Sequence, residues 1–67
     1  MTIGVYWFYQ KSLDRAIYVG SSQNIERRIR THIGKLKQGT HSNPKFQNTW
    51  SKYGKDDFLI ELLEETD

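Results

Sequence analysis

Residues 3–20 read IGVYWFYQKSLDRAIYVG and contain two short tyrosine clusters, Gly4-Val5-Tyr6 and Tyr18-Val19-Gly20. In a β-strand, residues two apart point to the same face. Gly4 and Tyr6 therefore share one face of a first strand, and Tyr18 and Gly20 share one face of a second. We expect a hairpin that brings two phenols together beside two positions without a side chain, where another backbone or a ligand can approach closely.

Three strands are predicted. Residues 3–10 are rich in aromatic and β-branched side chains, and they are apolar at both odd and even positions, which is typical of a central strand. Residues 11–15 form a polar connection of hairpin length, and residues 16–20 form the second strand. Residues 57–64 are the third predicted strand, with a helix as the alternative.

A first helix is predicted over residues 25–38. Side-chain oxygens that can cap its start are available at Ser21, Ser22 and Asn24. Gly39 ends it, because glycine accepts the left-handed conformation that terminates many helices. Its apolar residues follow spacings of four, four and three, which form one helical stripe: Ile25, Ile29, Ile33 and Leu36.

A second helix is predicted over residues 44–53, because Asn43 is a capping residue and Pro44 suits the first helical position. Gly54 ends it. Its expected apolar face consists of Phe46, Trp50 and Tyr53. The predicted fold class is α+β, a small three-stranded antiparallel sheet with two helices in the order ββααβ.

The composition limits the class of protein. A chain of 67 residues forms one domain, residues 1–67. The absence of cysteine excludes disulfides and thiolate zinc sites, and it fits a reducing compartment. No apolar run reaches the roughly 18 residues of a membrane span, and no signal peptide is apparent. We expect a soluble, cytoplasmic protein without a membrane partner.

The net charge of +2 hides an uneven distribution. Residues 1–54 carry nine Lys and Arg side chains against Asp14 and Glu26, whereas residues 55–67 carry Lys55 against six carboxylates. A basic body favours a polyanionic partner such as nucleic acid. Mild basicity is also common among small soluble proteins, so charge alone leaves both interpretations open.

Arg28 and His32 are four residues apart and therefore lie on the same edge of the first predicted helix, beside its apolar stripe. Lys35 continues that edge. Phenols beside a cationic helix edge suit the binding of a phosphate group. The alternative is structural: Arg28 and His32 cover the boundary of the core, and Tyr6 is an ordinary core aromatic.

In order along the chain, these features resemble the GIY-YIG nuclease domain family. The matching features are Gly4-Val5-Tyr6, Tyr18-Val19-Gly20, a Ser-Ser-x-Asn cap, Arg28 with His32, His41, Asn43-Pro44-Lys45, Gly54, and a last strand with paired glutamates. The resemblance spans nearly the whole chain and is greatest to the homing-endonuclease branch. It implies hydrolysis of phosphodiester bonds, with DNA as the expected partner.

The resemblance also implies roles for individual residues. Tyr6 would perform acid–base chemistry on the attacking water, Arg28 would contact the scissile phosphate, and Tyr18, His32 and His41 would support them. A guanidinium beside Tyr6 is expected to lower the pKa of the phenol by favouring phenolate. Further contacts to nucleic acid are expected from the neighbouring basic and hydroxyl side chains: Arg27, Arg30, Lys35, Ser21 and Ser22.

GIY-YIG nucleases use a divalent metal ion, Mg²⁺ or Mn²⁺, held by a glutamate on a helix after the third strand. This sequence ends at Asp67, before such a helix, so the usual ligand is missing from it, and Glu61, Glu64 and Glu65 are the candidate substitutes. The interpretations left open are a fragment of an active nuclease, one half of an active unit, and a short form that has neither metal nor activity. The alternative function is a catalytically silent relative that binds nucleic acid or a protein as a regulator. The missing helix should uncover a face of the sheet, so we also expect a homodimer or a partner protein there, with Trp7 and Leu63 in the contact.

Overall fold

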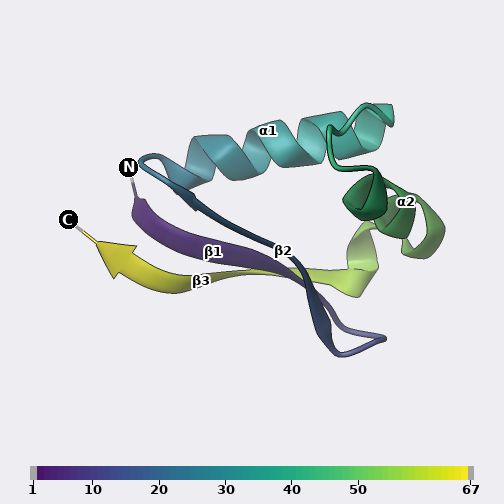
Figure 1. Cartoon of the computed structure of the whole chain (residues 1–67), viewed down its shortest axis with the longest axis horizontal. Helices are drawn as coiled ribbons and strands as arrows, with labels where there is room; N and C mark the ends of the chain where they lie inside the picture. The colour runs from purple at the N-terminus through teal and green to yellow at the C-terminus, as the bar shows by residue number, and fades with distance from the viewer. Residues whose placement is uncertain (1, 67) are drawn as a thin grey trace.

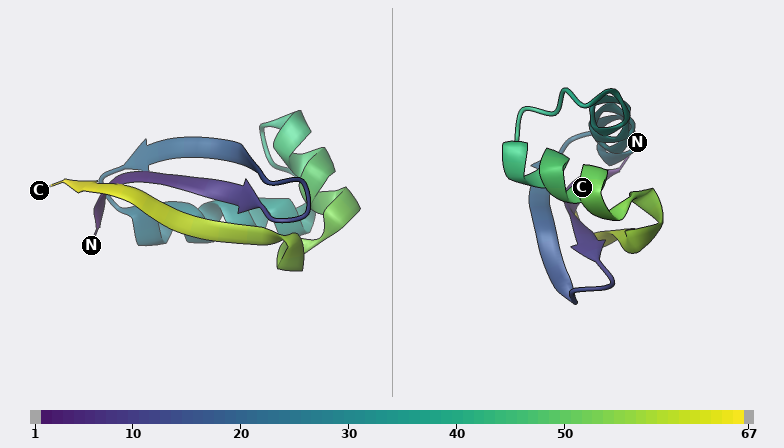
Figure 2. Two further views of the ribbon diagram at one scale, coloured as in Figure 1. Left: turned by 90° about the horizontal axis from the view of Figure 1, so that it is seen from below. Right: turned by 90° about the vertical axis from the view of Figure 1, so that its right-hand side faces the viewer.

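The computed structural model describes residues 2–66. Its elements are β1 (Ile3–Gln10), β2 (Arg15–Ser22), α1 (Ile25–Gln38), α2 (Pro44–Tyr53), the short 3-10 helix η1 (Lys55–Asp57) and β3 (Phe58–Thr66). The strands form one antiparallel sheet in the order β2-β1-β3, and both helices lie on the same side of it (Figures 1 and 2). The predicted α+β fold and the ββααβ order are confirmed.

β1 is the central strand, as predicted, and its residues alternate between buried and partly exposed. The even positions, among them Tyr6, Phe8 and Gln10, face the helices and are buried. The odd positions face away from the helices and are only half-buried. Since both helices cover one face, the other face of the sheet stays open to solvent (Figure 2).

The outer strands differ from their predicted bounds. β2 runs on through Ser21 and Ser22, which pair with β1, so neither residue is the cap of α1. β3 begins at Phe58 and pairs with β1 along its length, so the alternative of a helix there is wrong. The pairing skips Ile17 in β2 and Leu63 in β3, and each skipped residue marks a bulge.

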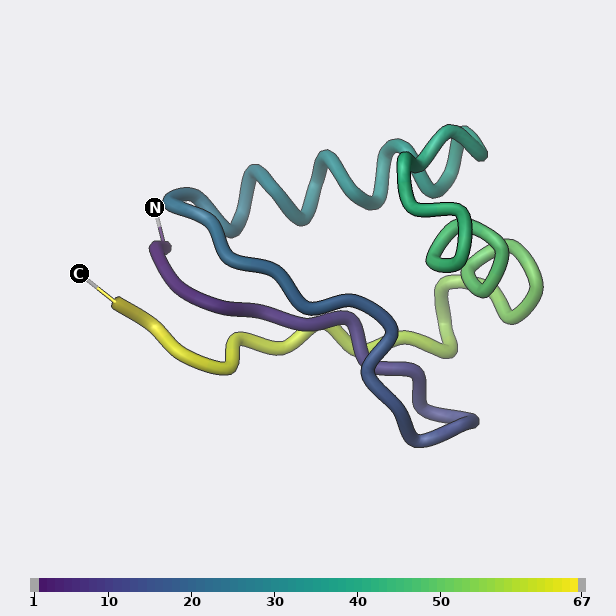
Figure 3. The backbone as a smooth tube through the Cα atoms, viewed as in Figure 1, coloured from purple at the N-terminus to yellow at the C-terminus, as the bar shows by residue number. Residues whose placement is uncertain are grey.

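The two helices begin and end where the sequence predicts. The side chain of Asn24 caps α1 by accepting a hydrogen bond from the Arg27 backbone N–H, and Gly39 ends the helix in the left-handed conformation with φ of 76°. Asn43 caps α2 in the same way, and Gly54 follows its last residue. The connection between α1 and α2 lies at the end of the molecule opposite the start of β1 (Figure 3).

The core lies between the helices and the sheet. Its buried apolar residues are Tyr6, Phe8, Ile25, Leu36, Phe46, Trp50 and Phe58. Tyr53, predicted on the apolar face of α2, is instead 38% exposed, because it is the last residue of that helix. β3 is the least covered strand, with Leu59, Ile60, Leu62 and Leu63 all exposed. No helix within residues 2–66 is both long and apolar enough to cross a membrane.

Candidate active site

The two glycines of the tyrosine clusters make room for groups of this chain itself. A Cβ atom on Gly20 would lie 2.8 Å from the Tyr6 hydroxyl oxygen, so the phenol occupies the space that a side chain would fill. A Cβ atom on Gly4 would lie 1.9 Å from the backbone oxygen of Glu64. The expected close approach of a backbone is therefore that of β3 at Gly4, and the space at Gly20 is filled by Tyr6 rather than by a ligand.

Tyr6 begins a chain of hydrogen bonds that runs through both histidines. The Tyr6 Oη atom lies 2.8 Å from His32 Nε2, and His32 Nδ1 lies 2.8 Å from His41 Nε2. The backbone N–H of Asn43 donates to His41 Nδ1 at 3.0 Å. All four imidazole nitrogens are therefore engaged, and the chain links β1, α1 and the start of α2.

Aromatic rings surround this polar chain. Tyr18 packs edge-on against His32 with ring centroids 4.8 Å apart, and it stacks on Phe46 at 5.3 Å. Phe8 approaches His32 from β1 with a centroid distance of 5.8 Å. Tyr6 is 1% exposed and His32 is 7% exposed. Because water is excluded, the interactions inside the chain are stronger than they would be at the surface.

The environment keeps both imidazoles neutral. Burial lowers the pKa of His32 to about 4, and the positive charges that His41, Arg28 and Lys35 carry or would carry act in the same direction. Burial also lowers the pKa of His41, with Lys35 as the second cause. Near pH 7 each ring therefore carries a single N–H.

The pKa of Tyr6 moves against the expectation from sequence. Burial raises it to about 12, and the neighbouring Tyr18 adds to the rise, whereas the Arg28 guanidinium acts in the opposite direction. The expected lowering was wrong, because the burial of the phenol raises its pKa by more than the Arg28 charge lowers it. A pKa near 12 leaves roughly one phenolate in 10⁵ molecules at pH 7.

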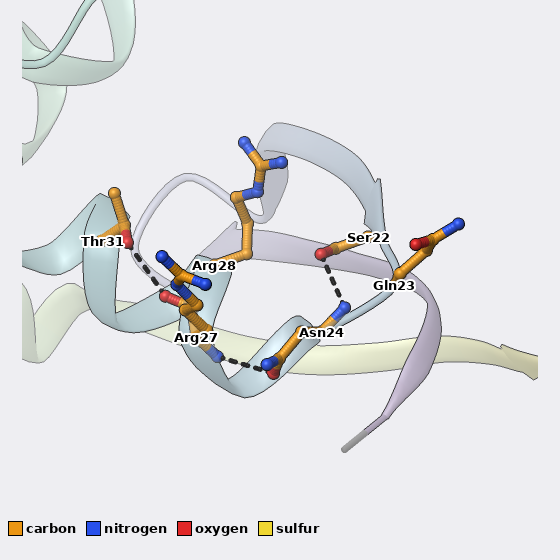
Figure 4. A pocket seen from close by; sticks show the side chains of 6 residues that line it. All are labelled: Ser22, Gln23, Asn24, Arg27, Arg28 and Thr31. Atoms are coloured by element: carbon orange, nitrogen blue, oxygen red, sulfur yellow. Dashed lines mark hydrogen bonds between the residues drawn. The ribbon is translucent and has the colours of Figure 1, made fainter.

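Arg28 itself is exposed, and it lies beside an open hollow of about 480 Å³ at the start of α1 (Figure 4). Arg28 precedes His32 by one turn of α1, and its positive charge acts on the pKa of both Tyr6 and His32. The hollow is lined by six residues: Ser22, Gln23, Asn24, Arg27, Arg28 and Thr31. Ser22, Arg27 and Arg28 were expected from the sequence, and the other three were not.

The remaining predicted contact residues are scattered. Lys35 lies on the same edge of α1 as Arg28 and close enough to affect the pKa of both histidines. Arg30 is two residues from Arg28, about 200° around the helix, so it points away from the hollow. Ser21 alternates with Gly20 along β2, so its side chain lies on the face of the sheet away from Tyr6.

The residues in the described part of the chain do not fit a divalent metal ion. Within residues 2–66 no three His, Cys, Asp or Glu side chains gather closely enough to hold one. The histidine nitrogens already bond to one another, to Tyr6 and to a backbone N–H, and Glu61 accepts a hydrogen bond from Trp7 Nε1 at 2.9 Å. We therefore derive no chemical step through a metal ion.

Residues 2–66 match the GIY-YIG catalytic domain family. The chain is 35% identical over 65 residues to the intron-associated endonuclease 1 of Enterobacteria phage T4, with 97% of this chain and 26% of that protein covered. Two solved structures of the catalytic domain of the homing endonuclease I-TevI, one of them a mutant, match with TM-scores of 0.88 and 0.87 at 33% and 31% identity. They cover 98% and 96% of this chain, which spans 66% and 67% of theirs. The chain thus spans about a quarter of the phage endonuclease.

Proposed function

The chain belongs to the GIY-YIG catalytic domain family and is related to the catalytic domain of a homing endonuclease, and from this premise we propose that it hydrolyses phosphodiester bonds in DNA. The observation that carries the proposal is the position of the Tyr6 hydroxyl. It is held by the His32–His41 chain, and its pKa is affected by the charge of the exposed Arg28 guanidinium, one helical turn before His32.

Arg28 is the residue proposed to bind the scissile phosphate. Its planar guanidinium can donate two parallel hydrogen bonds to a phosphate and never loses its charge. Arg27 lines the same hollow, and Lys35 lies further along the same edge of α1. These flanking cations would contact neighbouring phosphates and make binding depend on salt.

Tyr6 is the group proposed to take the proton of the attacking water. As the water oxygen forms its bond to phosphorus, the bond to the leaving oxygen breaks. The leaving oxygen takes up a proton from solvent, to which Tyr6 afterwards returns the proton that it took. Because the active form is phenolate and its pKa is raised to about 12, we expect the cleavage rate to rise roughly tenfold per pH unit between pH 7 and pH 9. A rate that is flat over this range would argue against phenolate as the base.

The proposal is tested by incubating supercoiled and linear DNA with the protein and Mg²⁺ or Mn²⁺. Tyr6→Phe and Arg28→Ala should each reduce cleavage by at least about 100-fold. Lys37→Ala is the matched control, because it removes one positive charge from α1 on the side about 180° from Arg28. Cleavage that survives both site substitutions would reject the assigned site.

A catalytically silent, DNA-binding regulator is the second candidate. Two observations favour it. Arg27 and Arg28 line an open hollow that can bind a phosphate, and no cluster of metal-binding side chains occurs within residues 2–66. Salt-dependent DNA binding without turnover at any Mg²⁺ or Mn²⁺ concentration would support this candidate over the nuclease. Metal dependence and cytoplasmic location stay predictions.

Self-association through the uncovered sheet also stays a prediction. It is supported by the exposed apolar side chains of Val19, Leu59 and Leu63. Trp7, the other expected contact residue, is half-buried and bonded to Glu61. Light scattering at high micromolar concentration should show a dimer, and a monomer would contradict it.

A further inference from the structure

Gln47 is a glutamine of α2, only 9% exposed, whose carboxamide joins three segments of the chain. Its Oε1 atom accepts a hydrogen bond from the His41 backbone N–H at 3.0 Å. Its Nε2 atom donates to the Leu36 backbone oxygen at 3.0 Å and to Ser51 Oγ at 3.1 Å. The orientation of the amide is fixed, because a backbone N–H only donates and a backbone carbonyl only accepts.

The loop before α2 depends on this side chain. The N–H groups of Gly39 and Thr40 bond to carbonyls at the end of α1, and the N–H of Asn43 bonds to His41 Nδ1. The partner of the His41 N–H is the side chain of Gln47. Gln47 therefore holds the backbone of His41 at the position from which its ring reaches both Asn43 and His32.

The hydrogen bonds of the histidine chain have a definite direction. The Asn43 N–H is a donor, so His41 Nδ1 must accept, and the single proton of neutral His41 is on Nε2. His41 Nε2–H then donates to His32 Nδ1, which places the proton of neutral His32 on Nε2. His32 Nε2–H in turn donates to the Tyr6 oxygen. Every donor in the chain thus points toward Tyr6.

We propose that Gln47 is a positioning residue, which holds His41 in the orientation that makes His32 the hydrogen-bond donor to the Tyr6 oxygen. A donor at that oxygen favours phenolate, and it leaves the proton of the Tyr6 hydroxyl free to point away from His32. The proposal rests on the role proposed for Tyr6 in DNA cleavage. The direction of the chain exists without substrate, however, and is measurable separately from activity.

The first test is ¹⁵N NMR of the imidazoles in the wild-type chain without DNA. The chain has two histidines, so one His41→Asn variant assigns both spectra. The nitrogen shifts distinguish Nδ1–H from Nε2–H, and we expect the Nε2–H form for both rings near pH 7. An Nδ1–H form at His41 would overturn the proposal.

Two substitutions at Gln47 separate positioning from packing. Gln47→Met keeps the length of the side chain but removes all its hydrogen bonds, and we expect mixed His41 tautomers and about a tenfold loss of cleavage, the size of one lost hydrogen bond. Gln47→Glu keeps the acceptor for His41 and loses the donors to Leu36 and Ser51, so it should retain the wild-type tautomer and most of the cleavage. Asn48→Ala, an exposed amide on the same helix, is the matched control and should change neither.

If Gln47 only packs α2 against α1, Gln47→Met should be tolerated, and Gln47→Glu should be the more damaging change because it buries a carboxylate opposite the Leu36 carbonyl. Unchanged His41 tautomers in folded Gln47→Met, or a changed tautomer in folded Gln47→Glu, would overturn the proposal. If Gln47→Met does not fold, the Gln47→Glu and wild-type spectra still decide. A wild-type chain that shows the expected tautomers but never cleaves DNA would refute the nuclease function and support the positioning role.

Discussion

Two polar networks start from buried residues on the same face of β1, four positions apart, and they have different roles. Tyr6 belongs to the histidine chain beside Arg28. Gln10, which is fully buried, donates to Asp57 at 3.0 Å and accepts a hydrogen bond from Arg15 Nε at 3.1 Å. One network is subject to the charge of the exposed Arg28, and the other ties the β-hairpin to the start of β3.

The two networks treat charge in opposite ways. Asp57 accepts hydrogen bonds from the N–H and hydroxyl of Ser12 and from Gln10, and the Ser12 hydroxyl is the first cause of its lowered pKa. Its carboxylate is therefore ionised, and its bonds are already made within the fold. The histidine chain instead keeps its groups neutral next to an unshielded guanidinium. The first arrangement stabilises a fold, whereas the second leaves positive charge available for an incoming anion.

The largest effect is expected from Gly20→Ala, which disturbs the histidine chain without removing any member of it. The added methyl group would lie 2.8 Å from the Tyr6 oxygen, so the phenol or the β2 backbone must shift, which disturbs the hydrogen bond between Tyr6 and His32. We expect DNA cleavage to fall about 100-fold, close to the effect of Tyr6→Phe. The measurement is the initial rate on supercoiled plasmid at fixed pH. Undiminished cleavage would mean that the Tyr6–His32 bond is not needed.

Gln10→Ala tests the other network and should change stability rather than chemistry. It removes two hydrogen bonds and leaves a void in the core, so the free energy of unfolding should fall by about 2–3 kcal/mol in urea denaturation. Cleavage per folded molecule should match the wild type. A cleavage rate that falls in fully folded Gln10→Ala would erase the distinction between the two networks.

The fold could be predicted almost fully from sequence because its signals are local. The strands, the two helices and their caps at Asn24 and Asn43 depend on alternation, spacing and neighbouring residues. In the same way, the shared edge of Arg28 and His32 needs only the helical repeat. Strand alternation alone also shows that Ser21 is not beside Tyr6, since Ser21 and Gly20 must point to opposite faces of the sheet.

The details of the site depend on depth and on backbone groups that a sequence does not display. The direction of the Tyr6 pKa shift depends on how deeply the phenol is buried. Gln47 resembles any polar residue of an amphipathic helix, and the donor to His41 Nδ1 is a backbone N–H that every residue except proline has. The hydrogen bond between Gln10 and Asp57 was missed because the two residues are 47 positions apart in the sequence.

The pH dependence of stability should separate the two networks. The pKa of His32 is lowered from 6.5 to about 4, so between these values the unfolded chain binds a proton that the folded chain does not. The contribution of His32 to stability is therefore complete above about pH 6.5 and falls by about 3 kcal/mol as the pH drops to about 4. The pKa of Asp57 is lowered from 3.8, so that network loses stability only below about pH 3.8.

Urea denaturation at pH 7, 5.5 and 4.5 measures this slope, and the decline should begin well above the range in which Asp57 titrates. A folded His32→Asn variant should lose most of the decline, since the proton uptake of the unfolded chain at this position is gone. Stability that is constant from pH 7 to pH 4.5 in the wild type would show that His32 is protonated as readily in the fold as in the unfolded chain.

The smallest effect is expected from Gly34→Ala, which makes the same chemical change as Gly20→Ala at a position in α1 with nothing within 4 Å of the new methyl group. Glycine in a helix interior costs about 0.5–1 kcal/mol relative to alanine, so the variant should be more stable by that amount in urea denaturation. Cleavage should be unchanged, because the new methyl group would contact neither the histidine chain nor the hollow. If Gly34→Ala impaired cleavage as Gly20→Ala is expected to, the loss would reflect a general sensitivity of the small domain to an added methyl group. The contact between Gly20 and Tyr6 would then no longer explain it.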